Sequence, residues 1–231
     1  MRIFLQPAYI LHARPYRETS MLLDVFSEEH GRVALVAKGV RTARSKWRSM
    51  LQPFSPLFLS WQGKSELMGL HQAEPNGLPI LLKGECLLSG FYLNELMMRL
   101  LQKQDPHPRL YTIYQDTLLE LQGLHLQEKT LRLFEKKLLA ELGYDLPLPI
   151  GLGAESSYYI FLPGQGFELT SSENSGGSAV FSGKSLQAIA GDQFDDADVL
   201  RDAKRLMRMA LAPLLGRQPL QSRKLFIEIV T

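Results

Sequence analysis

The chemistry that this sequence offers most plainly is anion binding by a basic stretch, Gly31 to Phe54, in the first third of the chain. The stretch holds six basic residues and no acidic one between its first and last cation: Arg32, Lys38, Arg41, Arg44, Lys46 and Arg48. Trp47 lies among them. Cations neutralise backbone phosphates and a flat ring stacks on a base, so the stretch is a candidate nucleic-acid contact. A solvated polar loop is the alternative that composition leaves open.

A second basic cluster lies beside the apolar stripe of a predicted helix, Gln127 to Leu142. Its members are Arg132, Lys136 and Lys137. One interpretation is a solvated helix face. The other is an apolar groove with a basic rim, which would suit an acidic peptide that ends in an aromatic residue.

Other motifs point away from catalysis and metals. Ser182 to Ser185 reads SGKS, like the end of a phosphate-binding loop, but residue 178 is serine where that motif needs its first glycine. The five histidines are scattered without metal-ligand spacing, and the single cysteine, Cys86, begins an apolar helix and is expected to be a core thiol. No nucleophile elbow is apparent. We therefore expect a binding protein rather than an enzyme, with no cofactor and no metal.

Charge is unevenly distributed along the 231 residues. The net charge is +2, and residues 1–80 carry ten Lys and Arg against six Asp and Glu, so the positive excess lies in the first third. One cysteine excludes an internal disulfide. The N-terminal apolar run is too short for a signal peptide, and no run approaches the length of a membrane span. We expect a cytoplasmic protein with no membrane partner.

The first 79 residues have the pattern of a small β domain. Alternating or extended segments are predicted over residues 8–14, 21–26, 32–38, 57–61 and 66–73. Five short strands fit an OB-fold, the five-stranded barrel type that binds oligonucleotides. A small sandwich or an SH3-like barrel fits the same periodicity.

The rest of the chain has helical periodicity with one interruption. Helices are predicted over residues 87–97, 110–121, 127–142, 184–190, 199–211 and 222–230, with Pro213 ending the fifth. Residues 150–183 are rich in Gly and Ser and are expected to be irregular and partly β. The fold class is therefore α+β. We expect four parts: 1–79 OB-fold, 80–149 central helical domain, 150–183 irregular region and 184–231 C-terminal helices packing on the helical domain.

Several segments together resemble the bacterial recombination mediator family RecO. They are Pro15–Ser20, Gly31-Arg32, Val36–Gly39, Leu51–Phe54, Tyr92–Leu96, Arg132–Glu135, Leu142–Tyr144, Arg208–Leu211 and Ser222–Phe226. The resemblance covers nearly the whole chain. One departure is the segment Leu148–Gly166, which has no cysteine where many relatives carry a four-cysteine zinc module.

The resemblance implies a non-catalytic role in DNA repair and recombination. It implies binding to single- and double-stranded DNA, annealing of complementary strands, and cooperation with RecR to load RecA on strands coated by the single-stranded DNA-binding protein SSB. The loop cations, Lys38 to Arg48, fall where the family's OB-fold contacts DNA. Arg132 falls where the family's helical domain receives the acidic SSB tail. The alternative is an adaptor that uses a helical groove without binding DNA itself.

Overall fold

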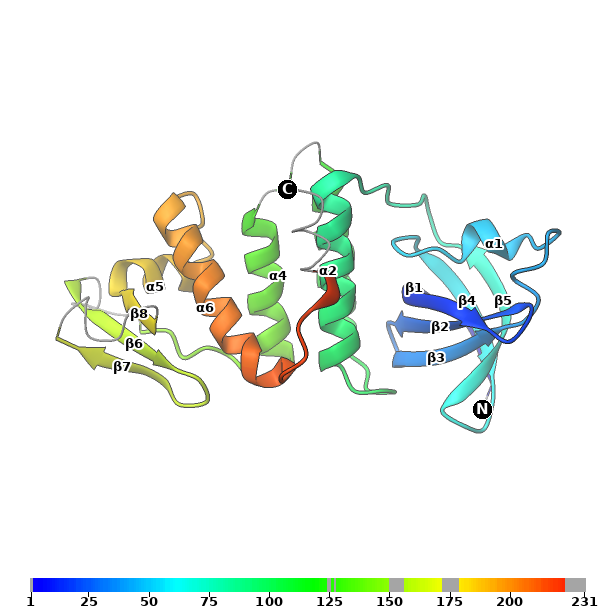
Figure 1. Ribbon diagram of the computed structural model, residues 1–231, viewed down its shortest axis with the longest axis horizontal. Coiled ribbons are helices and arrows are strands. Elements are labelled where there is room, and N and C mark those ends of the chain that lie inside the picture. The colour runs from blue at the N-terminus through cyan, green and yellow to red at the C-terminus, as the bar shows by residue number, and fades with distance from the viewer. Residues whose placement is uncertain (1, 124–125, 127, 150–155, 172–178, 223–231) are drawn as a thin grey trace. The chain divides into compact units, whose positions relative to one another are not determined.

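The computed structural model describes residues 2–123, 126, 128–149, 156–171 and 179–222. The chain packs as two compact units (Figure 1). The first unit is Met1–Leu126 with Pro219–Thr231, and the second is Gln127–Gln218. In the described part of the chain, no helix combines the length and the apolarity needed to cross a bilayer.

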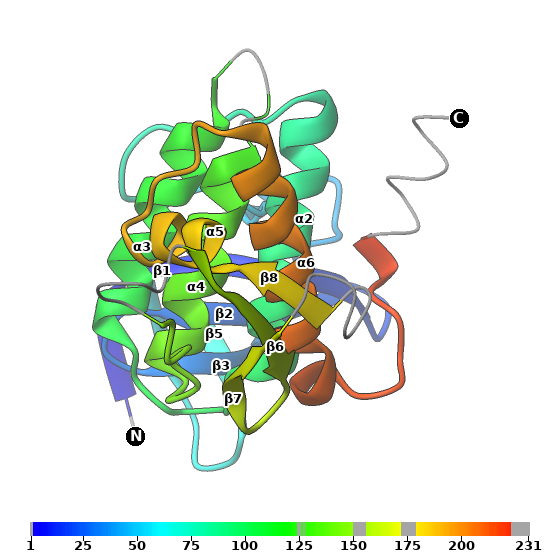
Figure 2. The ribbon, with the colours of Figure 1, turned by 90° about the vertical axis from the view of Figure 1, so that its left-hand side faces the viewer.

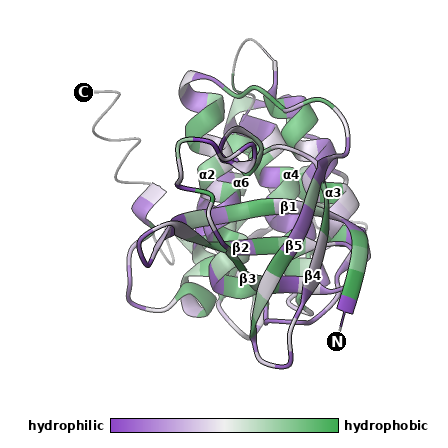
Figure 3. Cartoon of the chain, turned by 90° about the vertical axis from the view of Figure 1, so that its right-hand side faces the viewer, coloured by the Kyte–Doolittle hydropathy of each residue, from purple (hydrophilic) through white to green (hydrophobic). Residues whose placement is uncertain are grey.

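The first unit contains a closed barrel of five strands. They are β1 (Arg2–Tyr16), β2 (Ser20–Ser27), β3 (Gly31–Ala37), β4 (Leu57–Gln62) and β5 (Leu67–Pro75), in the order β1-β2-β3-β5-β4. Neighbouring strands are antiparallel except β3 and β5, which pair in parallel. This is an OB-like barrel, as predicted, and the sandwich is excluded because the sheet closes on itself. Figure 3 shows the apolar segments distributed along these strands.

Alternation of side chains explains the barrel interior. On β3, Val33, Leu35 and Ala37 are buried while the residues between them are partly exposed, because successive side chains of a strand point to opposite faces. Trp61 on β4 is fully buried in the same core. The strand predicted at residues 32–38 is therefore confirmed together with its inward face.

Gly31 fixes the turn that enters β3. Its φ is +60°, and a Cβ atom placed there would lie 1.9 Å from the carbonyl oxygen of Asp105. Only glycine tolerates both the left-handed backbone and so close an approach. The segment that follows the first long helix is held here, since Gln104 N–H donates to Arg32 O at 2.9 Å.

Two helices of the first unit pack on the outer face of the barrel. They are α2 (Gly84–Leu100) and α3 (Pro108–Leu121). Tyr9 of β1 lies 5.5 Å from Tyr111 and 5.2 Å from Tyr114, ring centroid to ring centroid. Asn94 donates to Leu11 O at 2.8 Å and accepts from Tyr114 Oη at 2.6 Å, both within the buried interior. The helices therefore cover part of the face of β1 and β2.

The second unit combines three helices with a small sheet. Its helices are α4 (Glu128–Glu141), α5 (Gly183–Ala190) and α6 (Ala197–Leu215), and its strands are β6 (Tyr158–Leu162), β7 (Gly166–Thr170) and β8 (Val180–Ser182). The strand β6 is central, between β7 and β8 (Figure 2). The helix α6 packs against both α4 and α5. The region expected to be only partly β thus contributes an antiparallel sheet.

The predicted end of α6 was wrong. Pro213 lies inside the helix, which continues to Leu215 and stops at Gly216, with φ +66°. A proline in the last turn removes a single intrahelical hydrogen bond, so it does not stop the helix there. Its start agrees with the sequence, because Asp196 caps it by accepting from Asp198 N–H. The helix predicted over 222–230 lies outside the described residues except for Ser222.

The four predicted domain limits stay a prediction. The two compact units group α2 and α3 with the barrel, whereas α4 belongs with α5, α6 and the small sheet.

Candidate nucleic-acid interface

The basic loop, residues 38–48, runs from the end of β3 into the first two residues of the short helix α1 (Trp47–Met50). Val40, fully buried, anchors its first half, and Leu51, 1% exposed, anchors the chain just after it. Between them the backbone folds on itself: Thr42 Oγ1 donates to Gly39 O at 2.7 Å and Ser45 N–H donates to Thr42 O at 3.2 Å. The loop is thus a folded element that presents its polar side chains outward.

The five cations of this loop are exposed. They are Lys38, Arg41, Arg44, Lys46 and Arg48. Within the described part of the chain, none of them forms an ion pair with a carboxylate. Five like charges within eleven residues create a positive potential that attracts polyanions and that salt screens.

Arg41 joins the basic loop to the turn between β1 and β2. Its guanidinium donates to Arg17 O and Glu18 O, each at 3.2 Å, and its backbone N–H donates to Thr19 O at 2.9 Å. The turn is strained, because Arg17 has a φ of +52°. The basic loop therefore holds this turn in place through Arg41.

This bracing brings two further residues to the same end of the barrel. The Arg17 guanidinium lies over the ring of Tyr16 at 5.3 Å, and Arg17 is exposed. Sequence reasoning left both residues out of the candidate interface. The signal that could have found them is the OB-type strand order, in which the turn between the first two strands borders the ligand-binding face.

Two residues that the sequence placed in the interface have internal contacts. Trp47 is partly buried and packs against the barrel core. Arg32 stands at the start of β3, 15% exposed, with Nη1 3.9 Å from Asp24 Oδ1 and 3.9 Å from Met98 Sδ. Five residue steps of strand, about 17 Å, separate it from the end of β3 where the loop begins. The structure therefore brings Lys38 to Arg48 together without Arg32.

The second candidate cluster lies on α4, and two of its three cations are already bonded. Arg132 donates to Glu135 Oε1 at 2.8 Å, and both residues are buried. Lys136 Nζ donates to Ile189 O and Ala190 O, each at 2.8 Å, and to Asp192 Oδ1 at 2.6 Å. It thereby satisfies carbonyls at the end of α5. Lys137 is exposed.

The SGKS segment has a structural role. Ser182 is the N-cap of α5, and its hydroxyl accepts from Ser185 N–H at 3.1 Å. This is ordinary helix capping, which explains the serine spacing without a phosphate. Cys86 is 4% exposed, and burial raises the pKa of its thiol, so the predicted core thiol is confirmed.

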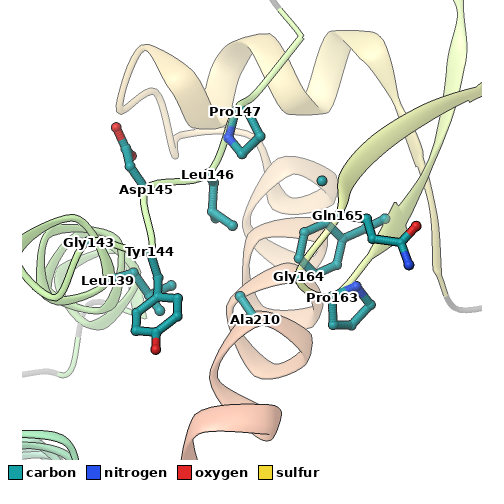
Figure 4. A pocket seen from close by; sticks show the side chains of 12 residues that line it. Leu139, Gly143, Tyr144, Asp145, Leu146, Pro147, Pro163, Gly164, Gln165 and Ala210 are labelled. Carbon is teal, nitrogen blue, oxygen red and sulfur yellow. The ribbon is translucent and has the colours of Figure 1, made fainter.

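A pocket of about 290 Å³ lies in the second unit (Figure 4). Part of its lining, residues 163–166, comes from the cysteine-free segment Leu148–Gly166. Its wall includes Tyr144, Asp145 and Leu146 after α4, Gln165 in the turn between β6 and β7, and Ala210 of α6. Its lining offers one carboxylate and one amide and no thiol or imidazole, which is a poor ligand set for zinc.

Comparisons with known proteins match the whole chain. The family model described as "Recombination protein O N terminal" matches residues 1–78, and "Recombination protein O C terminal" matches residues 83–224. A protein of Coxiella burnetii named "DNA repair protein RecO" is 47% identical over 230 residues, which cover 97% of this chain and 98% of the relative. Relatives of the same name from Nitrosococcus oceani and Alkalilimnicola ehrlichii are 46% and 43% identical, with 99% of this chain covered and 95% and 92% of theirs. The chain belongs to the RecO family of DNA repair proteins.

Proposed function

We propose that this protein is a non-catalytic recombination mediator that binds single- and double-stranded DNA, anneals complementary strands and, with RecR, helps load RecA on SSB-coated single strands. Five exposed loop cations without a carboxylate partner in the described structure are the observation that carries the DNA-binding part. Family membership supports the repair role. We place its action in the cytoplasm, on the nucleoid.

The proposed mechanism is electrostatic. Two single strands repel each other through their phosphates, and the basic loop lowers this repulsion by neutralising charge on both. Cations that contact phosphates make no contact with base edges. Binding is therefore expected to be nearly independent of the DNA sequence. No bond is made or broken, which is consistent with a mediator.

The second step of the proposal is docking on SSB through α4. Lys137 carries its ammonium group at the surface, and no bond of this group or of Arg132 Nε is found among the described residues. An acidic tail would have to compete with Glu135 for the Arg132 guanidinium. Docking of this kind would place the basic loop on strands that SSB already coats.

The decisive experiment is binding of a fluorescent single-stranded oligonucleotide across a salt series. If all five loop cations contact phosphates, the slope of log affinity against log salt is about −3.5, from about 0.7 per contact. The variant Arg44→Gln, Lys46→Gln, Arg48→Gln should reduce the magnitude of this slope by about 2. These side chains are exposed, so folding should be spared.

The charge-matched control is Lys184→Gln, Arg208→Gln, Arg217→Gln, which removes three exposed cations of the second unit. It should leave the slope unchanged. Equal slopes for the native protein and the loop variant would refute the loop assignment. No DNA binding at low salt would favour the adaptor.

A further inference from the structure

A groove with leucine walls lies in the first unit, where the connection from β5 to α2 passes α3. Its volume is about 610 Å³, within the range typical of binding pockets. Leu78 and Leu81 of the connection and Leu119 of α3 contribute its apolar lining, and Gln115 and Gln122 contribute amides. We call this feature the leucine groove. It shares no residue with the basic loop.

The leucines of this groove are exposed although they are apolar. The exposed fractions are 88% for Leu78, 68% for Leu81 and 51% for Leu119. Three exposed leucines in one hollow form an apolar patch, and such patches mark interaction sites more often than single exposed leucines do.

Two backbone hydrogen bonds and two buried side chains hold the connection from β5 to α2 in place. The exposure of its leucines therefore follows from the fold. Asn76 N–H donates to Pro56 O at 2.9 Å and Ile80 N–H donates to Phe54 O at 3.1 Å. Ile80 and Leu82 are buried on either side of Leu81. Their burial fixes Leu81 pointing outward, so the groove is formed before any partner arrives and binding requires little ordering.

Tyr9 also lines the groove and provides an unused polar atom. The residue is 1% exposed, and its hydroxyl has no hydrogen-bond partner among the described residues. A buried hydroxyl without a partner is unfavourable, and an incoming polar group relieves that penalty. Tyr9 therefore favours a ligand with backbone or side-chain polar atoms over a purely apolar one.

Exposed carboxylates adjoin residues of the groove along the chain. Asp116 and Glu120, exposed on α3, are the sequence neighbours of the groove residues Gln115 and Leu119. Asp116 is close enough to Tyr9 to contribute, after burial, to the raised pKa of that tyrosine. Glu74, exposed and next to last in β5, lies two residues before the groove residue Asn76, and Lys83, two residues after Leu81, is the exposed cation nearest in sequence. We call Glu74, Asp116 and Glu120 the acidic rim.

We propose that the leucine groove docks a segment of a protein partner that carries apolar anchor residues flanked by lysine or arginine. The apolar walls bury the anchors, the Tyr9 hydroxyl bonds a polar atom of the segment, and the acidic rim selects the basic flanks. An acidic peptide is repelled here, so this surface is separate from the proposed docking of the SSB tail on α4. The proposal does not depend on DNA binding.

The test uses a fluorescein-labelled amphipathic peptide of about 14 residues built from leucine and lysine, and a second peptide in which glutamate replaces every lysine. Anisotropy titrations near physiological salt compare the native protein with Leu78→Asp, Leu81→Asp. We expect this variant to bind the leucine–lysine peptide about tenfold more weakly, because anchor contacts dominate such interfaces. Both leucines are exposed, so the variant should fold, and thermal unfolding checks this.

Three further variants sharpen the result. Leu169→Asp, at a leucine 70% exposed on β7, is the matched control and should leave the affinity unchanged. Asp116→Asn, Glu120→Gln should flatten the salt dependence of leucine–lysine binding, and Tyr9→Phe should weaken binding a few-fold. Equal leucine–lysine affinity for the native protein and Leu78→Asp, Leu81→Asp would overturn the proposal.

Self-association would also overturn it. If the native protein formed dimers that Leu78→Asp, Leu81→Asp abolished, and bound no leucine–lysine peptide, the groove would be an interface between copies. DNA affinity measured on the same variants should stay native, which separates failure of this proposal from failure of the DNA-binding one.

Discussion

At the scale of single residues, Arg41 differs from the other cations of the basic loop. It donates to two carbonyl oxygens of the turn between β1 and β2, so it holds this turn against the basic loop and also contributes charge to the proposed interface. Arg44, Lys46 and Arg48 are exposed and contribute charge alone in the described structure. A single guanidinium nitrogen of Arg41, Nη1, donates to both carbonyl oxygens.

Replacing Arg41 should therefore reduce the affinity for DNA more than replacing Arg44 does. We expect Arg41→Ala to weaken single-strand binding about tenfold, because the turn carrying Tyr16 and Arg17 loses its brace, and Arg44→Ala to weaken it only about threefold. Arg41→Lys keeps the charge and should restore the salt slope without restoring full affinity, since the shorter lysine side chain does not carry its ammonium group to the position where Arg41 Nη1 meets both carbonyl oxygens. Fluorescence anisotropy across salt measures both quantities. Identical losses for the two alanine variants would show that the brace has no role in binding.

The sequence predicted exposure at this loop and failed to predict internal bonding elsewhere. An uninterrupted run of cations without acids is too polar to bury, so exposure of Lys38 to Arg48 follows from composition. Lys136 finds its acceptors 53 to 56 residues further along the chain, and no local pattern shows such contacts. The partner of Arg132 at i+3 is visible in the sequence, but the burial of that pair depends on tertiary packing.

At the scale of elements, the alternation of apolar residues and the positions of Gly and Pro predicted four of the five barrel strands to within two residues at each end, whereas β1 begins at Arg2, six residues before the predicted segment 8–14. Residues 57–61 became β4, Leu57–Gln62, and residues 32–38 became β3. The packing of α2 and α3 on β1 and β2 was not predicted, because hydropathy shows that a face is apolar without showing which element covers it. That packing buries Tyr9, Phe26, Tyr111 and Tyr114 against one another.

The buried tyrosines between barrel and helices make stability sensitive to high pH. Burial raises the pKa of Tyr9 to about 12, and it also raises the pKa of Tyr111 and Tyr114. A tyrosine in the unfolded chain loses its proton near pH 10. The unfolded state therefore binds fewer protons than the folded state above that pH, and the free energy of unfolding falls as pH rises from about 10 through about 12.

Urea unfolding at pH 8 and pH 11 tests this expectation. The native protein should be clearly less stable at pH 11, and Tyr9→Phe should lose less between the two values because one titrating group is gone. Tyr16→Phe is the control, since Tyr16 is partly exposed and lies outside the cluster. A pH dependence unchanged by Tyr9→Phe would contradict the assignment of that shift to Tyr9.

At the scale of the whole molecule, the two compact units divide the proposed activities. The basic loop belongs to the first unit and the cations of α4 to the second. Folding each surface in its own unit allows DNA contact and SSB docking to be removed separately. Mutation of Arg132 to alanine is a poor way to remove SSB docking alone. It would remove the ion pair that the buried Glu135 forms with Arg132, and breaking a buried pair costs about 3–5 kcal/mol.

Lys137 offers the cleaner separation, because it is exposed and carries no structural bond that the described residues reveal. We expect Lys137→Glu to weaken binding of an SSB-tail peptide about fivefold to tenfold by charge repulsion, while naked-DNA binding stays native. The loop variant Arg44→Gln, Lys46→Gln, Arg48→Gln should bind naked DNA more weakly and should bind the SSB-tail peptide with native affinity. Lys184→Glu reverses an exposed charge in the same unit and should change neither the binding of the SSB-tail peptide nor the binding of naked DNA. The proposed mechanism uses both surfaces to anneal SSB-coated strands, so we expect either variant to slow this annealing. If Lys137→Glu and Arg132→Lys both left the peptide titration unchanged, α4 would not be the docking surface, and SSB would have to be engaged elsewhere.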